Sequence, residues 1–200
     1  MEELDQIVLD SLLRPKSIAI VGASSTQGKI GHTVVKNLID SGFQGNIYPV
    51  NPKANEILGL TTYPSVTNIP GDIDVADIIV PAKFVPQVVE ECGKKGVKGL
   101  VIIASGFSEM GREDLEAQTV EIAHQYGMRI LGPNIVGMLS NSDQCNDSFA
   151  PFLPLDGKAA LVSQSGALLI AMDASTYTRR VGFDKLVSIG NMSDINFGDL

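Results

Sequence analysis

Strand-sized apolar runs alternate with amphipathic segments along most of this 200-residue chain, and this alternation limits the possible folds more than any other feature. Strands joined by helical crossovers form a parallel sheet with helices on both faces. We therefore predict an α/β fold. The expected strands are residues 17–23, 46–51, 74–81, 97–105 and 128–134.

Helices are expected between several of these strands, where apolar residues recur at helical spacing. The first helix should end at Pro15 and the second at Gly42, because proline and glycine commonly follow helix ends. Two further helices are predicted over residues 83–96 and 112–127. Pro86 is compatible with the third helix only in its first turn.

Composition favours a folded protein: 44% of residues are hydrophobic and 19% are charged. The net charge of −8 argues against nucleic acid or an anionic membrane as the main partner. Two cysteines make neither a disulfide framework nor a zinc site. We therefore expect no metal, and we expect a reducing, cytoplasmic location. The acidic N-terminus does not resemble a signal peptide, and no apolar run reaches the roughly 20 residues of a membrane span.

Three segments are expected along the chain: a first domain over residues 1–140, a linker over 141–158, and part of a second domain over 159–200. The linker is predicted because this stretch is polar with scattered prolines. The last segment contains two strand patterns around one helix pattern. Because two strands do not make a stable open sheet, we expect the chain to be a piece of a longer protein.

The loop after the first strand has the composition of an anion-binding loop. Parallel sheets bind ligands at the carboxyl ends of their strands, and helix N-termini attract anions. The glycines at positions 22, 28 and 31 do not have the spacing of the dinucleotide fingerprint, and Ser24, Ser25 and Thr26 lie between the first two. The loop therefore suits phosphate, although an ordinary strand-to-helix turn is the alternative.

Lys53 follows the second strand, where an NAD-binding domain usually has an acidic residue for the ribose hydroxyls. A cation there suits an additional phosphate on the ribose, at the 2′ position in NADP or the 3′ position in coenzyme A (CoA). A solvated surface lysine is the alternative interpretation.

Six motifs in this chain resemble, in the same order, the CoA-binding subunit of nucleoside-diphosphate-forming acyl-CoA synthetases. This family includes ADP-forming acetate–CoA ligases and is related to the α subunit of succinyl-CoA synthetase. The motifs are SIAIVGASSTQGKIGHTVVKNL, IYPVNPK, VPAKFVP, IIASGFSE, ILGPN and LVSQSGAL.

The resemblance implies a Rossmann-like CoA-binding domain followed by the start of a flavodoxin-like ligase domain. It implies a ligase that joins a small carboxylic acid to CoA while ATP becomes ADP and phosphate, through an acyl phosphate and a phosphohistidine. ATP or ADP with Mg²⁺ would bind an ATP-grasp domain or β subunit outside this chain, and an oligomer is expected. This 200-residue piece alone should be inactive.

Candidate CoA-binding residues are carried over by position from this resemblance. Those around the phosphates are Ser24, Ser25, Thr26, Gln27 and Gly28, with Lys53 near the nucleotide. Those along the adenine and pantetheine arm are Pro81, Ala82, Ile103, Ala104 and Ser105.

A second phosphate site is predicted at the helix that begins after the strand over residues 159–164. Ser163, Ser165 and Gly166 lie where a helix N-terminus would attract an anion, and the resemblance implies the phosphate of a phosphohistidine there. A plain serine cap is the alternative. Asn134 in the GPN turn is a further candidate, although a purely structural turn is an equal alternative. Ile135 replaces the family's cysteine, so we assign it no chemistry.

Neither histidine fits the family's phosphohistidine, so no catalytic residue is predicted in this chain and the active histidine is expected after Leu200. His32 follows the glycine loop, and His124 is predicted to be a solvated surface residue. Two other functions stay open. One is a CoA-sensing region of a protein lysine acetyltransferase, and the other is an NAD(P) oxidoreductase, which the glycine spacing and Lys53 disfavour.

Overall fold

A computed structural model describes residues 2–200, and side chains from residue 6 onward. A five-stranded parallel sheet forms its centre, in the order β2–β1–β5–β6–β7. The bounds are β1 Ser17–Val21, β2 Asn46–Val50, β5 Val75–Ile78, β6 Gly99–Ile102 and β7 Arg129–Leu131. All five predicted strands are therefore present.

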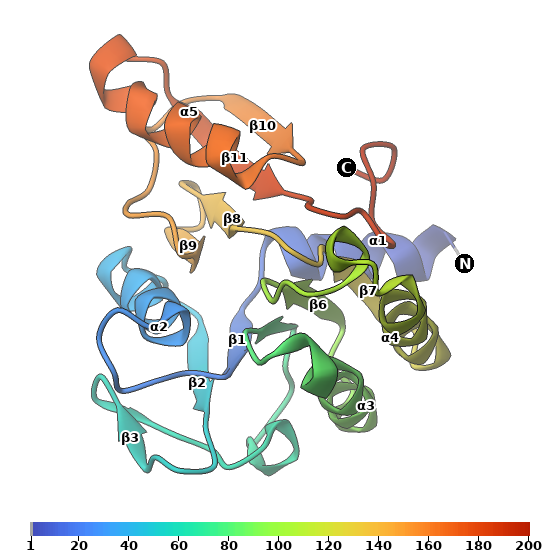
Figure 1. Cartoon of the computed structure of the whole chain (residues 1–200). Helices are drawn as coiled ribbons and strands as arrows, with labels where there is room; N and C mark the ends of the chain where they lie inside the picture. Colours follow the sequence, from blue (N-terminus) through green and yellow to red (C-terminus); the bar gives the residue numbers. More distant parts are fainter. Residues whose placement is uncertain (1) are drawn as a thin grey trace.

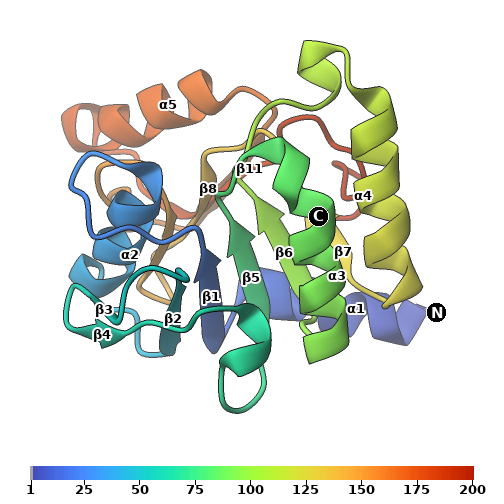
Figure 2. The ribbon, with the colours of Figure 1, turned by 60° about the horizontal axis from the view of Figure 1, so that its bottom comes forward.

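Helices cover both faces of this sheet because its central strands are buried on both sides and predominantly apolar, although Asp77 on β5 is a buried acid. Figure 2 shows α3 (Val85–Lys95) and α4 (Glu113–Gln125) in front of the sheet and α1 (Glu2–Leu13) behind it. The helix α2 (Ile30–Asp40) packs on the same face as α1. Each face has its own buried apolar cluster, one under α3 and α4 and one under α1 and α2. No helix in the described part of the chain is long and apolar enough to cross a membrane.

The strand order reverses between β1 and β5. From β1 the chain moves to one side, to β2, and then crosses back to β5, β6 and β7 on the other side. At such a reversal, the loops after the two neighbouring strands diverge to opposite faces and leave a crevice at the carboxyl edge. The loops after β1, β2 and β5 meet there.

A second sheet lies beside the first, in the order β10–β11–β8–β9 (Figure 1). Its strands are β8 Gly137–Ser140, β9 Cys145–Ser148, β10 Ala159–Ser163 and β11 Phe183–Ser188. One face packs against the cluster under α1 and α2, and the other against α5 (Gly166–Arg179). The second sheet is therefore enclosed between the first sheet and α5.

The expected linker over residues 141–158 is not simply a linker, because it contains β9. This strand pairs antiparallel with β8 and contacts α2. Three of its four residues are polar yet buried, and two of them are bonded to each other: Ser148 Oγ donates to Asn146 Oδ1 at 2.6 Å. The hairpin thereby adds two strands to the parallel pair of β10 and β11. The sheet is larger than the two-strand unit expected from the sequence.

Short elements complete the fold. The hairpin β3–β4 follows β2 and was absent from the sequence prediction, as were three 3-10 helices. Their bounds are β3 Glu56–Ile57, β4 Leu60–Thr61, η1 Val66–Asn68, η2 Ala82–Phe84 and η3 Ser108–Met110.

Candidate functional site

Two glycines define the path of the chain after β1. Gly22 has φ of +100°, and a Cβ there would lie 3.2 Å from the Ile79 carbonyl carbon, so the loops after β1 and β5 touch. A Cβ on Gly31 would overlap the Gly22 carbonyl oxygen, which only glycine permits. The start of α2 therefore lies directly against the end of β1.

The loop between these glycines presents polar groups to solvent. Ser25, Thr26, Gln27 and Gly28 are exposed, and the Ser24 hydroxyl accepts a hydrogen bond from the Thr26 amide at 3.1 Å. Among residues 2–200, nothing accepts a hydrogen bond from the amides of Ser25, Gln27 and Gly28. These free donors therefore lie in an exposed loop beside the positive end of α2.

The N-terminus of α2 lacks a side-chain cap. Its N-cap position is Lys29, which is exposed and cannot accept a hydrogen bond from the first turn. The helix begins with no acidic residue in its first turn. Both features leave the positive helix end available to an anion.

Asn51 joins the loops after β1 and β2. Its side-chain amide donates to the Ala23 carbonyl at 2.7 Å, and its side-chain oxygen accepts from the Lys53 amide at 2.8 Å. Sequence reasoning places residues 51–53 at the ligand edge, after the second strand, but assigns this asparagine no role of its own, although an Asn-Pro pair after a strand commonly starts a turn. Its effect is to hold the backbone of Lys53 close to the phosphate loop.

A cavity of about 400 Å³ lies beside Lys53 at the reversal of the strand order. It lies between the carboxyl ends of β1, β2 and β5 and the helix α3. Its lining is Val21, Gly22, Val50, Asn51, Pro52, Lys53, Pro64, Ser65, Val80, Val88 and Glu91. Pro64 and Ser65 could not be anticipated, since they come from a loop distant in sequence with no local motif.

The predicted arm-binding residues lie on adjacent loops after β5 and β6. A Cβ on Gly106 would lie 3.2 Å from the Ala82 Cβ, so the two loops are in contact. Pro81 and Ser105 are exposed, whereas Ala82, Ile103 and Ala104 are buried. The Ile103 side chain belongs to the buried cluster under α1 and α2, so only its backbone could face a ligand.

The predicted second phosphate site lies at the start of α5. Ser165 is the N-cap: its hydroxyl accepts from the Leu168 amide at 3.2 Å. The Ser163 hydroxyl accepts from the Ser165 amide at 3.1 Å and is buried, so it supports the turn. A Cβ on Gly166 would lie 2.5 Å from Val136 Cγ2, which places the helix start against the loop after β7.

Asn134 lies in that same loop, at a φ of +63°, with its side chain exposed. Its side-chain amide donates to the Asn191 side-chain oxygen at 3.3 Å. Asn191 in turn donates to Glu109 Oε2 at 2.7 Å and to Glu116 Oε2 at 2.8 Å. Partial burial raises the pKa of Glu109, but hydrogen bonds from the Gly106 amide and Asn191 outweigh this effect and lower it below its ordinary value. These bonds join the loops after β6, β7 and β11.

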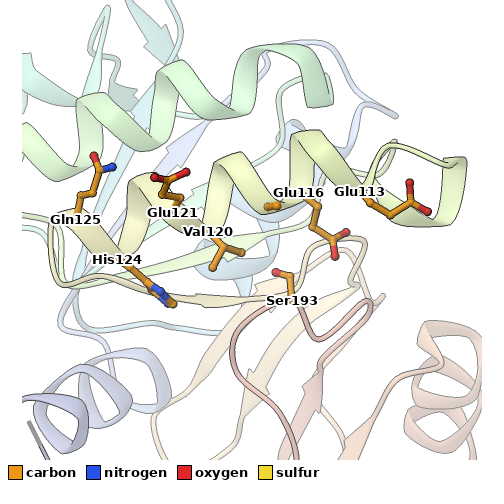
Figure 3. A pocket seen from close by; sticks show the side chains of 8 residues that line it. Glu113, Glu116, Val120, Glu121, His124, Gln125 and Ser193 are labelled. Carbon is orange, nitrogen blue, oxygen red and sulfur yellow. The ribbon is translucent and has the colours of Figure 1, made fainter.

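A larger groove of about 740 Å³ runs along α4, with Ser193 on its other side (Figure 3). Glu113, Glu116 and Glu121 line it and make it unfavourable for phosphate groups. His124 lies there, half exposed, with Nε2 3.1 Å from Asp194 Oδ1. The lining of the groove includes none of the predicted CoA-binding residues. His32, by contrast, is buried on α2.

Comparisons with known proteins identify the family of this chain. Residues 16–141 match the CoA binding domain family, and residues 156–200 match the succinyl-CoA ligase like flavodoxin domain. The chain is similar to the acetate–CoA ligase [ADP-forming] I subunit alpha of Pyrococcus furiosus, with 51% identity over 96% of this chain and 43% of that protein. It is also similar to the acetate–CoA ligase [ADP-forming] of Methanocaldococcus jannaschii, with 50% identity over 93% of this chain and 26% of that protein.

Among solved structures, the chain resembles the Ca. Korarchaeum cryptofilum dinucleotide forming acetyl-coenzyme A synthetase 1 in complex with phosphate and ADP. The TM-score is 0.94 at 46% identity, over 96% of this chain and 41% of that one. This chain therefore spans less than half the length of each of these relatives. It belongs to the CoA binding domain family and matches the CoA-binding part of ADP-forming acetate–CoA ligases.

Proposed function

We propose that this chain binds CoA at the carboxyl edge of its five-stranded sheet, as the CoA-binding part of an ADP-forming acid–CoA ligase. The observation that carries the proposal is the cavity beside Lys53, which adjoins an exposed loop with free amides in a chain that matches the CoA binding domain family. The complete ligase would join a small carboxylic acid to CoA while ATP becomes ADP and phosphate.

The residues present fit CoA in two respects. The free amides and hydroxyls of residues 24–28, beside the uncapped start of α2, suit the diphosphate. Lys53 is an exposed cation next to a cavity whose walls include valine and proline side chains, which suits an adenosine with a phosphate on its ribose. Pro81 and Ser105 are the exposed residues along which the pantetheine arm would leave.

Titration calorimetry tests the ligand. The chain should bind CoA with much higher affinity than NAD, because the site offers a cation where NAD needs an acceptor for its ribose hydroxyls. Lys53→Ala should weaken CoA binding by about ten- to a hundredfold and leave dephospho-CoA binding nearly unchanged, since one hydrogen bond to a charged group contributes about 1.5–3 kcal/mol. Lys158→Ala, at an exposed lysine just before β10, is the matched control.

Equal losses for CoA and dephospho-CoA would place Lys53 away from the 3′-phosphate. Stronger binding of NAD than CoA would contradict the proposed function itself.

A second part of the proposal concerns the start of α5. Ser165, Gly166 and the neighbouring Asn134 would receive the phosphate of a phosphohistidine located after Leu200 in the complete enzyme. The support is the exposed helix start, which lies against the loop after β7. Ser163 would act through the turn, because its hydroxyl is engaged with the Ser165 backbone.

Ser165 is the best position for a test, because any side chain on Gly166 would collide with Val136. Aspartate and asparagine both cap helices well, but only aspartate adds a negative charge. In the complete protein, Ser165→Asp should therefore block phosphorylation from labelled ATP, while Ser165→Asn should keep most of it. Both variants should bind CoA normally by calorimetry. Full phosphorylation of the Ser165→Asp variant would mean that this helix start is only a capped end.

The named relatives that match more than nine-tenths of this chain are CoA ligases or synthases, which favours a ligase over an acetyltransferase-linked sensor. One of them, at 40% identity, is a 4-hydroxybutyrate–CoA ligase. The choice of acid therefore belongs to segments that this part does not include. ATP or ADP with Mg²⁺ would bind an ATP-grasp domain or β subunit. We also propose an oligomeric enzyme in the reducing cytoplasm, which suits the buried free thiols of Cys92 and Cys145.

A further inference from the structure

Asp77 is a fully buried acid on the central strand β5. Its register partners are Ile20 on β1 and Val101 on β6, and both belong to the buried cluster under α1 and α2. Val75 shares that face, because alternate residues of a strand point the same way. The Asp77 carboxyl group therefore points from the first sheet toward the second.

Asp147 is a fully buried acid on β9, in the hairpin that follows the first sheet. It lies opposite Met138 of β8, which belongs to the same buried cluster as Ile20 and Val101. Directly opposite residues in an antiparallel pair share a face. The Asp147 carboxyl group therefore points from the second sheet back toward the first, where Asp77 lies.

The two carboxyl groups have no other partners. Within residues 2–200, no donor reaches any of their four oxygens. The two carboxyl groups face each other within one buried cluster, so a hydrogen bond between them is the pairing open to both, and each shifts the pKa of the other. Ionised carboxylates only accept hydrogen bonds, so this contact requires a proton on one of the two. Two unpaired charges at this depth would be far more costly than one shared proton.

The surroundings favour the protonated form. Burial raises the pKa of Asp77 well above its ordinary value, and the charge of Asp147 raises it further. Burial also raises the pKa of Asp147. Among the side chains that the structure describes, those in this cluster are apolar: β1, β6 and β8 contribute Ile20, Val101 and Met138, and α1 contributes Val8 and Leu12.

Other titratable groups on these elements are few. Cys145 on β9 is a buried thiol whose pKa is raised by burial and by the charge of Asp147. The helix α2 contributes buried His32, and Asn37, which holds the end of β9 through its Ser148 and Ala150 carbonyl groups. Lys185 on β11 binds Asp143 at 2.8 Å and is not bonded to the pair.

We propose that Asp77 and Asp147 share a proton and form a pH-sensitive latch that holds the β8–β9 hairpin on the CoA-binding sheet. The latch is closed while the pair keeps at least one proton. Loss of that proton leaves two facing charges without donors, and the hairpin should then separate from β5. Because α5 packs on the other face of the same sheet, the latch links the CoA-binding sheet to the unit that carries Ser165.

The sign of the pH effect follows from the raised pKa values. Both carboxyl groups bind protons more tightly in the folded chain than in the unfolded chain. Their contribution to stability is therefore complete below the pKa of an aspartate in the unfolded chain, which is near 4. It is lost as pH rises through the pKa values of the pair in the folded chain. Ordinary surface carboxylates that gain partners on folding have the opposite dependence.

Thermal unfolding of the full chain between pH 5 and pH 9 tests the latch. The double variant D77N/D147N keeps the shape of both side chains and can form one amide–amide hydrogen bond, but it has no proton to lose. The melting temperature of the wild type should fall relative to this variant by at least about 3 °C over this range. The control is Asp156→Asn, at an exposed aspartate before β10. Its melting temperature should change with pH in the same way as that of the wild type.

A second measurement does not depend on stability. Asp173 also titrates near pH 6, so the infrared spectra are recorded in an Asp173→Asn background. At pH 6 that protein should contain the band of a protonated carboxyl group, and this band should be missing when D77N/D147N is added. Parallel melting curves of wild type and double variant, or absence of the band, would overturn the proposal. So would a rise in wild-type melting temperature on addition of Mg²⁺ or Ca²⁺ that the double variant lacks, because the pair would then be a cation site.

Discussion

The side-chain amide of Asn51 donates a hydrogen bond to the carbonyl oxygen of Ala23 at 2.7 Å. This bond joins the end of β2 to the phosphate-loop side of β1, across the carboxyl edge of the sheet. Through its other side-chain atom, Asn51 also fixes the backbone of Lys53 at 2.8 Å. One uncharged side chain therefore sets the spacing between the proposed diphosphate loop and the proposed cation for the ribose phosphate.

Asn51→Ala should weaken CoA binding more than it weakens the fold. The variant loses both hydrogen bonds and frees the Lys53 loop, so we expect a five- to tenfold loss of CoA affinity, or about 1–1.4 kcal/mol. Calorimetric titration measures the affinity, and Asn55→Ala, at an exposed asparagine of the following loop, is the control. Unchanged affinity of the Asn51 variant would contradict its positioning role.

Gly31→Ala should destabilise the chain strongly. A methyl group at this position overlaps the Gly22 carbonyl oxygen, which is backbone and cannot rotate away. The helix α2 must then move from β1, at a cost of about 1–3 kcal/mol or more. Urea unfolding measures this, with Gly198→Ala as control, because a Cβ there meets only the side chain of Asn196. A fully stable Gly31 variant would show that α2 can shift freely.

Much of the first sheet could be predicted because its strands are buried on both faces and are therefore apolar nearly throughout. The carboxyl ends of parallel strands lie at one edge of the sheet. Both the loop after β1 and Lys53, which follows β2, could therefore be placed at that edge. The role of Asn51 could not be predicted, because it depends on a contact with Ala23, 28 positions earlier. Pro64 and Ser65 were missed because only the tertiary fold brings them to the cavity.

The β8–β9 hairpin could not be predicted because its strand β9 is polar. Asn146, Asp147 and Ser148 have the composition of a loop, yet all three are buried between the sheet and α2. Internal hydrogen bonds and a shared proton replace the water that such side chains normally bind. Hydrophobic periodicity predicts a buried strand only where the buried residues are apolar.

Asn37→Ala should destabilise the contact between α2 and this hairpin. The Asn37 amide donates to the carbonyl oxygens of Ser148 at 2.8 Å and Ala150 at 2.7 Å, and all three residues are buried. The variant removes this donor from the Ser148 carbonyl and leaves the Ala150 carbonyl only a longer bond from the Asn146 side chain at 3.4 Å, so the loss should cost about 1–3 kcal/mol. Urea unfolding should show this loss, whereas Lys36→Ala, which removes an exposed ion pair with Asp40, should cost less than about 1 kcal/mol. Similar losses for the two variants would contradict the role of Asn37.

Asp173→Asn should stabilise the chain at high pH and have little effect at low pH. Asp173 lies on the buried face of α5, and within the described residues its carboxylate has no hydrogen-bond donor. Burial raises its pKa to about 6. The folded chain thus binds this proton more tightly than the unfolded chain, so the contribution of Asp173 to stability is complete below about pH 4 and is lost as pH rises through about 6.

Asparagine cannot ionise, so its advantage over aspartate should appear only above that range. We expect the melting temperature of the Asp173→Asn variant to exceed that of the wild type by several degrees at pH 8 and to be nearly equal to it at pH 4.5. Calorimetry at both pH values measures the difference. Asp156→Asn provides the comparison at an exposed site, where the difference should be small at both. A shift of equal size at pH 4.5 and pH 8 would mean that the substitution acts through packing, and that Asp173 does not titrate in the range its burial requires.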